Sequence, residues 1–123
     1  MSVIKKVTTG LTGLKVAKFP HHQLSVVYGK ILRALAQMPE HAAYRVNTEK
    51  IVRERAQIVA TNDDPAVIES KIGGGQVEEL ITQAENELLL ARKFLSWKPW
   101  EPLLKSAPTR QWDWPPAKIQ KQT

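Results

Sequence analysis

The sequence predicts an all-α fold: a small helical bundle of three main helices plus one short helix, with an extended arm at each end. Apolar residues recur at spacings of three and four between residues 20 and 97, as they do on one face of a helix. Proline falls in that region only at positions 20, 39 and 65, where helices would begin or end. Prolines crowd the segment after residue 98, so no regular element is expected there.

These observations divide the chain of 123 residues into three parts. Residues 1–19 form a basic N-terminal arm, residues 20–97 the helical bundle, and residues 98–123 a Pro/Trp-rich C-terminal arm. This length suits one modest core rather than two.

The N-terminal arm favours an extended conformation because Gly10 and Gly13 interrupt any amphipathic helix. Pro20 suits the first turn of a helix, where its missing N–H costs nothing. Pro39 then ends that helix. Between the two prolines runs one apolar stripe, made of Leu24, Val27, Tyr28, Ile31, Leu32, Leu35 and Met38.

A second helix is expected from about Ala42 to Ala60. Its apolar stripe consists of Tyr44, Thr48, Ile51, Val52, Ile58 and Val59. Arg55 falls in the middle of that stripe, and two interpretations are open. Its stem packs while the guanidinium reaches past the edge of the core, or the guanidinium makes a charged contact with an acidic group elsewhere.

A short third helix is expected from Pro65 to about Ile72, capped by Asp63 or Asp64 and ended by the glycines at 73–75. The strongest helical pattern follows, from Gln76 to about Trp97. Its main stripe consists of Val77, Leu80, Ile81, Ala84, Leu88, Ala91 and Leu95. Leu89, Leu90 and Phe94 lie outside this stripe, so a second face of the helix needs a partner.

The C-terminal arm combines its prolines with Trp100, Trp112 and Trp114. Disordered tails are normally poor in aromatic residues, so this arm is expected to lie across a surface. Whether that surface belongs to the chain's own bundle or to a partner stays open. Since tryptophan is enriched at interface hot spots, the candidate partner-binding residues are Trp97, Trp100, Trp112, Trp114, Arg55 and Phe94.

The net charge of +6 lies entirely in the first third of the chain, because no acidic residue precedes Glu40. A basic, acid-free, Thr-containing N-terminus is typical of a mitochondrial targeting segment. The alternative is a basic arm that packs on something acidic. No stretch of 18 apolar residues occurs, so no membrane span is expected.

No catalytic, cofactor or metal site is expected, and no small-molecule substrate. The chain has no cysteine, which excludes thiolate chemistry and cysteine zinc sites. The adjacent pair His21 and His22 would point about 100° apart on a helix, which is unsuited to chelation. The glycines at 73–75 lack a phosphate-binding motif. The glutamates of the last helix spread around it, with Glu78 and Glu79 in its first turn, where the helix dipole favours anions. A helix N-terminus and a solvated face are therefore expected for Glu78, Glu79, Glu85 and Glu87.

An alternative function is a basic nucleic-acid-associated protein, for instance a component of the mitochondrial ribosome. The lysines are scattered, however, and no nucleic-acid-binding motif accompanies them. The apolar second face of the last helix and the Trp-rich arm suit a protein surface better than phosphates, so no nucleic-acid partner is expected.

Seven segments carry a resemblance to a known family, and their order and spacing together are specific. They are residues 8–14 (TTGLTGL), 28–32 (YGKIL), 43–45 (AYR), 74–79 (GGQVEE), 83–88 (QAENEL), 97–103 (WKPWEPL) and 111–115 (QWDWP). In these segments the chain resembles the alpha-subcomplex subunit 5 family of accessory subunits of mitochondrial NADH:ubiquinone oxidoreductase (complex I).

The resemblance implies a non-catalytic helical-bundle subunit that supports assembly and stability of the complex. It implies a place in the matrix-side peripheral arm near the quinone module, peripheral to the mitochondrial inner membrane. The implied partners are core and accessory subunits of that arm. The family has no associated cofactor or catalytic residue, so none carries over.

Overall fold

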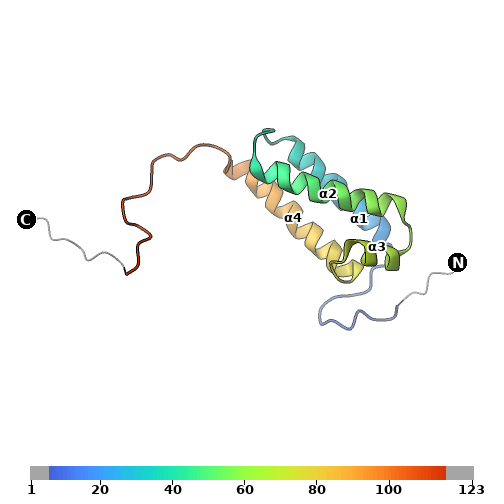
Figure 1. Ribbon diagram of the computed structural model, residues 1–123. Coiled ribbons are helices and arrows are strands. Elements are labelled where there is room, and N and C mark those ends of the chain that lie inside the picture. The colour runs from blue at the N-terminus through green and yellow to red at the C-terminus, as the bar shows by residue number, and fades with distance from the viewer. Residues whose placement is uncertain (1–5, 116–123) are drawn as a thin grey trace, which may run out of the picture.

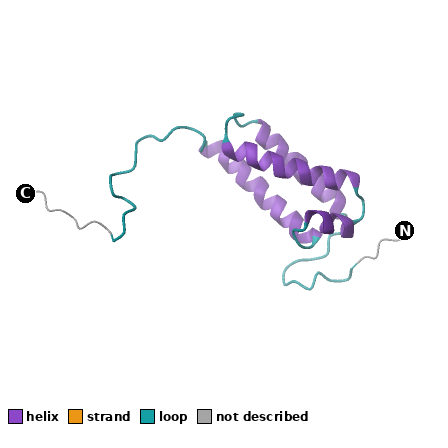
Figure 2. Ribbon diagram, viewed as in Figure 1, coloured by secondary structure: helices purple, strands orange, loops and turns teal. Residues whose placement is uncertain are grey.

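The computed structural model describes residues 6–115 and confirms the all-α class (Figures 1 and 2). In this part of the chain four helices are present and no strand: α1 (Pro20–Ala36), α2 (Ala43–Thr61), α3 (Pro65–Ile72) and α4 (Val77–Trp97). Irregular segments flank the helices on both sides. The outer parts of the two arms predicted from the sequence, residues 1–5 and 116–123, lie outside the described residues.

The helix boundaries follow from local signals. Pro20 and Pro65 each occupy the first turn of a helix, and the Asp64 carboxylate accepts a hydrogen bond from the Ala66 amide at 3.0 Å. This identifies Asp64 rather than Asp63 as the cap of α3. Gly73 ends α3 with a left-handed φ of 70°, a conformation that costs a glycine little.

The end of α1 differs from the prediction by two residues. Gln37 and Met38 were assigned to the helix, but their amides donate to the carbonyls of Ala34 and Leu35, three residues back. Such bonds tighten the final turn of a helix. Met38 still packs into the core from this turn. Its apolar side chain therefore continues the helical spacing in the sequence, although the α-helix has already ended at Ala36.

The bundle is centred on α1, which packs against both α2 and α4, while α3 bridges the ends of α2 and α4 (Figure 1). The core lies along α1 and α4. Its fully buried large side chains are Tyr28, Leu24, Ile31, Leu35, Ile68, Leu80, Val59 and Val77. Burial of these apolar surfaces is the main favourable contribution to the stability of the bundle.

The predicted stripe of α2 is too wide. Ile51 was placed on the buried face but is exposed, and only Val52 and Val59 of this helix are fully buried. The reason is that α2 packs extensively against α1 alone among the long helices. A helix with one long neighbour buries a narrower stripe than a helix wedged between two.

Candidate functional site

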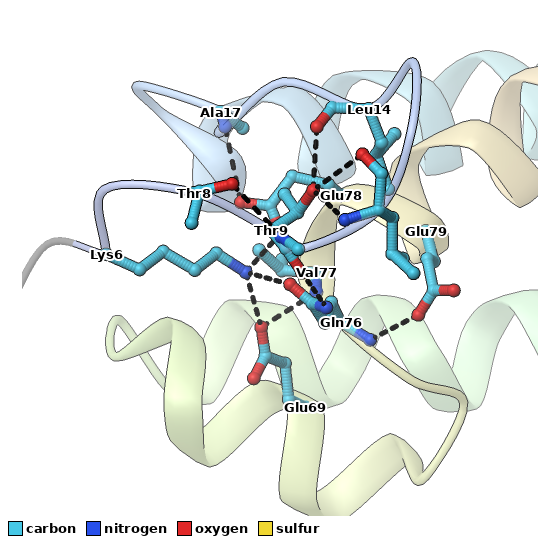
Figure 3. Close-up of polar contacts among 12 residues, drawn as sticks. Lys6, Thr8, Thr9, Leu14, Ala17, Glu69, Gln76, Val77, Glu78 and Glu79 are labelled. Carbon is cyan, nitrogen blue, oxygen red and sulfur yellow. Dashed lines mark hydrogen bonds and ion pairs between the residues drawn. The ribbon is translucent and has the colours of Figure 1, made fainter.

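The N-terminal arm folds back on the start of α4, where it forms a polar cluster (Figure 3). At its centre is Glu78, whose side chain is only 3% exposed. The Lys6 ammonium donates to one carboxylate oxygen at 2.5 Å, and the Ala17 amide donates to the other at 3.2 Å. Both oxygens of this buried carboxylate therefore have partners from the arm.

Neighbouring groups complete the cluster. Lys6 also donates to the Gln76 side-chain oxygen at 2.8 Å, and its nitrogen lies 3.6 Å from Glu69. The Gln76 amide nitrogen donates in turn to the Thr9 carbonyl at 2.7 Å. At the beginning of α4 the amides of Val77 and Gln76 donate to Glu69 and Glu79, both at 2.8 Å. Carboxylates are favourable there because a helix N-terminus has unpaired amides and partial positive charge.

The expected place of Glu78 in the first turn of the helix is confirmed, but the solvated position expected for it is wrong. The physical reason is a partner 72 residues away in the sequence, which brings a cation over the carboxylate. The interpretation of the N-terminal arm as a basic segment that packs on acidic groups describes Lys6 well. Because Lys6 faces Glu78 and Glu69 within its own chain, its charge is partly neutralised and contributes little to a phosphate-binding surface.

Acid is expected to release the N-terminal arm. Burial by itself raises the pKa of the Glu78 carboxyl, but the hydrogen bonds from Lys6 and backbone amides, together with the Lys6 charge, lower that pKa below its ordinary 4.5. A carboxyl with a lowered folded-state pKa stabilises the fold at neutral pH, and that contribution is lost as pH falls through the lowered value. We therefore expect the amide resonance of Ala17 to titrate below pH 4.5 in NMR spectra.

Two variants check this assignment. Glu78→Gln should abolish the titration of the Ala17 resonance, because the amide side chain carries no ionisable proton. Glu85→Gln, at an exposed position on the same helix, should leave the titration unchanged. A midpoint at or above the ordinary value would show that Lys6 does not hold the carboxylate in solution.

The C-terminal arm leaves the bundle after α4 and extends away from it (Figure 2). Lys98 ends the helix with a left-handed φ of 53°. Of the four predicted tryptophans, only Trp100 packs against the core. Trp97 is exposed, and Trp112 and Trp114 are 88% and 87% exposed. Trp100 therefore fits the alternative in which the arm packs on its own bundle. Trp112 and Trp114 do not pack against the hydrophobic core.

Phe94, the fifth predicted residue, belongs to an aromatic group at the end of α4. Its ring meets Tyr44 edge-on with centroids 4.4 Å apart, and the Trp97 ring lies 5.8 Å away. The Tyr44 hydroxyl donates a hydrogen bond to Glu87. Burial, as the larger cause, and this hydrogen bond both raise the pKa of Tyr44. Phe94 is half-buried, so it joins α2 to α4 and presents only part of its ring to solvent.

The second apolar face expected on α4 is exposed. Leu89 is 61% exposed and Leu90 is partly exposed, while Leu88 between the helices is buried. Leu90 lies at the rim of a groove between α2 and α4, with a volume of about 480 Å³. Arg55, the sixth predicted residue, lines the same groove. Within residues 6–115 no carboxylate lies within ion-pair distance of its guanidinium.

The sequence did not predict this groove. Eleven residues line it: Tyr28, Ile31, Thr48, Ile51, Val52, Arg55, Gln83, Ala84, Asn86, Glu87 and Leu90. They come from three helices, and only Arg55, a charged residue within the apolar stripe of α2, indicated the groove in the sequence.

In the described part of the chain, His, Asp and Glu side chains form no group of three that could hold a metal ion. None of the helices there is both long and apolar enough for a bilayer.

The chain matches a family model described as the electron-transport-chain complex I subunit conserved region, over residues 13–79. It is 50% identical to NADH dehydrogenase (ubiquinone) 1 alpha subcomplex subunit 5 of Bos taurus over 115 residues, which cover 94% of this chain and 99% of that protein. The probable subunit 5 of Caenorhabditis elegans is 54% identical over 110 residues, covering 89% and 73%. The probable mitochondrial subunit 5 of Arabidopsis thaliana is 39% identical over 95 residues, covering 77% and 56%.

Proposed function

Because the chain belongs to the alpha-subcomplex subunit 5 family of complex I, we propose that it is an accessory subunit of mitochondrial NADH:ubiquinone oxidoreductase. Its partners are then other subunits of this complex, and its location is at the mitochondrial inner membrane, where the complex resides. The single observation that carries this proposal is the 50% identity to the Bos taurus subunit over 94% of the chain.

The extent of that similarity matters as much as its level. The aligned 115 residues exceed the length of the bundle, so they include residues of the arms. A shared helical bundle alone would support only a shared fold, since one fold hosts many functions. An alignment that extends into the arms supports a shared binding role, because the C-terminal arm leaves the bundle and contributes little to the core.

The finer proposal places the subunit on the matrix side, in the peripheral arm near the quinone module, where it supports assembly and stability without catalysis. The family resemblance is its first support. The second is that Glu78, the one buried side-chain carboxylate among residues 6–115, is engaged by Lys6 and the Ala17 amide. A general acid or base must instead reach the proton of a substrate.

The contact residues proposed for this role are Trp97, Trp112 and Trp114, together with Arg55. All four keep a surface that the chain itself leaves uncovered. Exposure of a tryptophan ring to water is unfavourable in free energy, and burial of the ring at an interface strengthens binding. Trp100 and Phe94 act more indirectly in this proposal, because they fix the start of the arm against the bundle.

Depletion of the chain tests the proposed function. We expect the amount of fully assembled complex I to fall on native gels, and re-expression to restore it. Depletion should leave the mitochondrial ribosome profile unchanged, which separates this role from the nucleic-acid alternative. The isolated chain should oxidise no NADH. Unchanged complex I levels after complete depletion would contradict a supporting role.

A further inference from the structure

The groove between α2 and α4 has a floor and two walls. Tyr28 and Ile31 of α1 form the floor, Ile51 and Arg55 stand on the α2 side, and Leu90 stands on the α4 side. The walls are separate because both helices pack on α1 and meet each other mainly at the end occupied by Tyr44 and Phe94. In a four-helix bundle this position beside three helices would be filled by the fourth.

The Tyr28 hydroxyl is the unexplained group of the groove. Its side chain is only 2% exposed, and its oxygen is the one buried side-chain polar atom in the described residues that has no hydrogen-bond partner. Leaving such a group unpaired is unfavourable. Burial raises the pKa of this hydroxyl, and the charge of Arg55 together with its hydrogen-bonding interaction with the phenol oxygen opposes the shift only in part. Arginine can only donate hydrogen bonds, so the proton of the Tyr28 hydroxyl still has no acceptor. The hydroxyl therefore keeps a proton that it can donate to an acceptor entering the groove.

The charges of the groove favour an anionic acceptor at the Arg55 end. Arg55 lies beside the Tyr28 hydroxyl and has no ion-pair partner in the part of the chain that the structure describes. Glu87 is the only acidic group of the lining, and it accepts the Tyr44 hydroxyl. Tyr44 precedes Arg55 by eleven residues, which is about 16 Å along a helix. The two charges thus occupy different ends of the groove.

We propose that this groove receives a helix of a neighbouring complex I subunit, and that an Asp or Glu on this helix accepts a hydrogen bond from Tyr28 and pairs with Arg55. The inference rests on the proposed function and adds the position and chemistry of one contact. The exposed side chains of Ile51 and Leu90 would pack against apolar residues that flank the carboxylate. A helix meets these requirements because packed helices lie about 8–10 Å apart and interdigitate their side chains.

Site-specific crosslinking identifies the occupant of the groove. A photoreactive phenylalanine analogue is placed at Ile51 or Leu90 in the full chain, the assembled complex is irradiated, and linked peptides are sequenced by mass spectrometry. The control position is Lys30, an exposed residue of α1 outside the groove. We expect both groove positions to link to one helical segment of another subunit that contains an Asp or Glu.

Other occupants give different results in the same experiment. Links to a second copy of this chain, to its own C-terminal arm or to lipid would overturn the inference, as would absence of any link while the chain sits in the complex. In each of these cases the chain is still a subunit, so the proposed function stands. Failure of the chain to enter the complex would remove both.

Tyr28→Phe tests the hydrogen bond without changing the packing. In the isolated chain, the variant should be as thermally stable as the parent or slightly more stable, because it removes an unpaired buried hydroxyl. In competition with the parent chain for the complex, it should bind about tenfold more weakly or worse, as expected for losing a hydrogen bond to a charged group. Arg55→Gln should show the same loss.

The control for this competition is Arg53→Gln, which also removes an arginine charge from α2 but at an exposed position outside the groove. It should compete like the parent chain. Equal competition by Tyr28→Phe and the parent would show that the hydroxyl has no partner in the complex, and would overturn the inference.

Discussion

Replacing Leu80 with alanine is expected to lower the free energy of unfolding of the isolated chain by about 2–5 kcal/mol. Leu80 is completely buried on α4, where it packs into the core shared with α1. The substitution removes apolar contacts and leaves a cavity that a packed interior closes only in part. Small domains have total stabilities of about 5–15 kcal/mol, so this loss would leave the bundle marginal. Urea denaturation followed by circular dichroism measures the change.

Leu89→Ala is the matched control for this prediction. It deletes the same atoms from the same helix at a side chain that is 61% exposed. We expect its effect on the isolated chain to stay within about 0.5 kcal/mol. Equal destabilisation by the two substitutions would contradict the orientation of α4, because it would mean that both faces of the helix are buried in the isolated chain.

Replacing Trp112 and Trp114 together by alanine is expected to weaken association with the complex about thirtyfold or more. Both rings are almost fully exposed in the isolated chain, so their burial against a partner is the source of binding energy that we propose. Truncating one hot-spot tryptophan typically costs about 2 kcal/mol or more, which is about thirtyfold in affinity. The measurement is competition between the variant and the tagged parent chain for incorporation into the complex.

Two controls support the interpretation of that experiment. The thermal unfolding of the isolated double variant should match that of the parent, because neither ring belongs to the core. Lys105→Ala, at another exposed position of the same arm, should compete like the parent. If the double variant also competed equally, the C-terminal arm would contribute no tryptophan contact, and the interface would have to lie on the bundle.

The helices were largely predictable from the sequence because their signals are local. Pro20, Pro65 and Gly73 each act within one turn of the chain, through φ angles and amides that any folded context would preserve. The apolar stripe of α4 was nearly as reliable, since α4 packs extensively against α1 and all of its predicted residues except Leu95 are buried. The stripe of α2 was less so: whether Ile51 is covered depends on how many helices surround α2, which no local pattern encodes.

The candidate site was less predictable because its contacts are distant in the sequence. The burial of Glu78 depends on Lys6, and the role of Gln76 depends on the carbonyl of Thr9. No regular spacing of residues in the sequence predicts either of these two contacts. Arg55 did attract attention as a charge within an apolar stripe. Its neighbour Tyr28 did not, because a tyrosine on such a stripe is ordinary, and only the folded arrangement leaves its hydroxyl without a partner.

The tryptophans illustrate a similar limit. Their density in a proline-rich segment predicted a surface contact, and the sequence left open which surface. The structure separates Trp100, which packs against the core, from Trp112 and Trp114, which extend beyond it. The separation follows from distance along the chain: Trp100 lies just past Lys98, where α4 ends, so its ring reaches the bundle, whereas the outer pair lies further along an arm that points away.

The central claim, that this chain is a subunit of complex I, is tested most directly by its migration on native gels. Mitochondria that express the tagged chain are solubilised in mild detergent, and the gel is stained for NADH dehydrogenase activity and probed for the tag. We expect the tag to coincide with the large active band and to stay there when salt is raised, since an apolar interface is weakly screened. A tag found only at low mass, beside an intact active band, would contradict the claim.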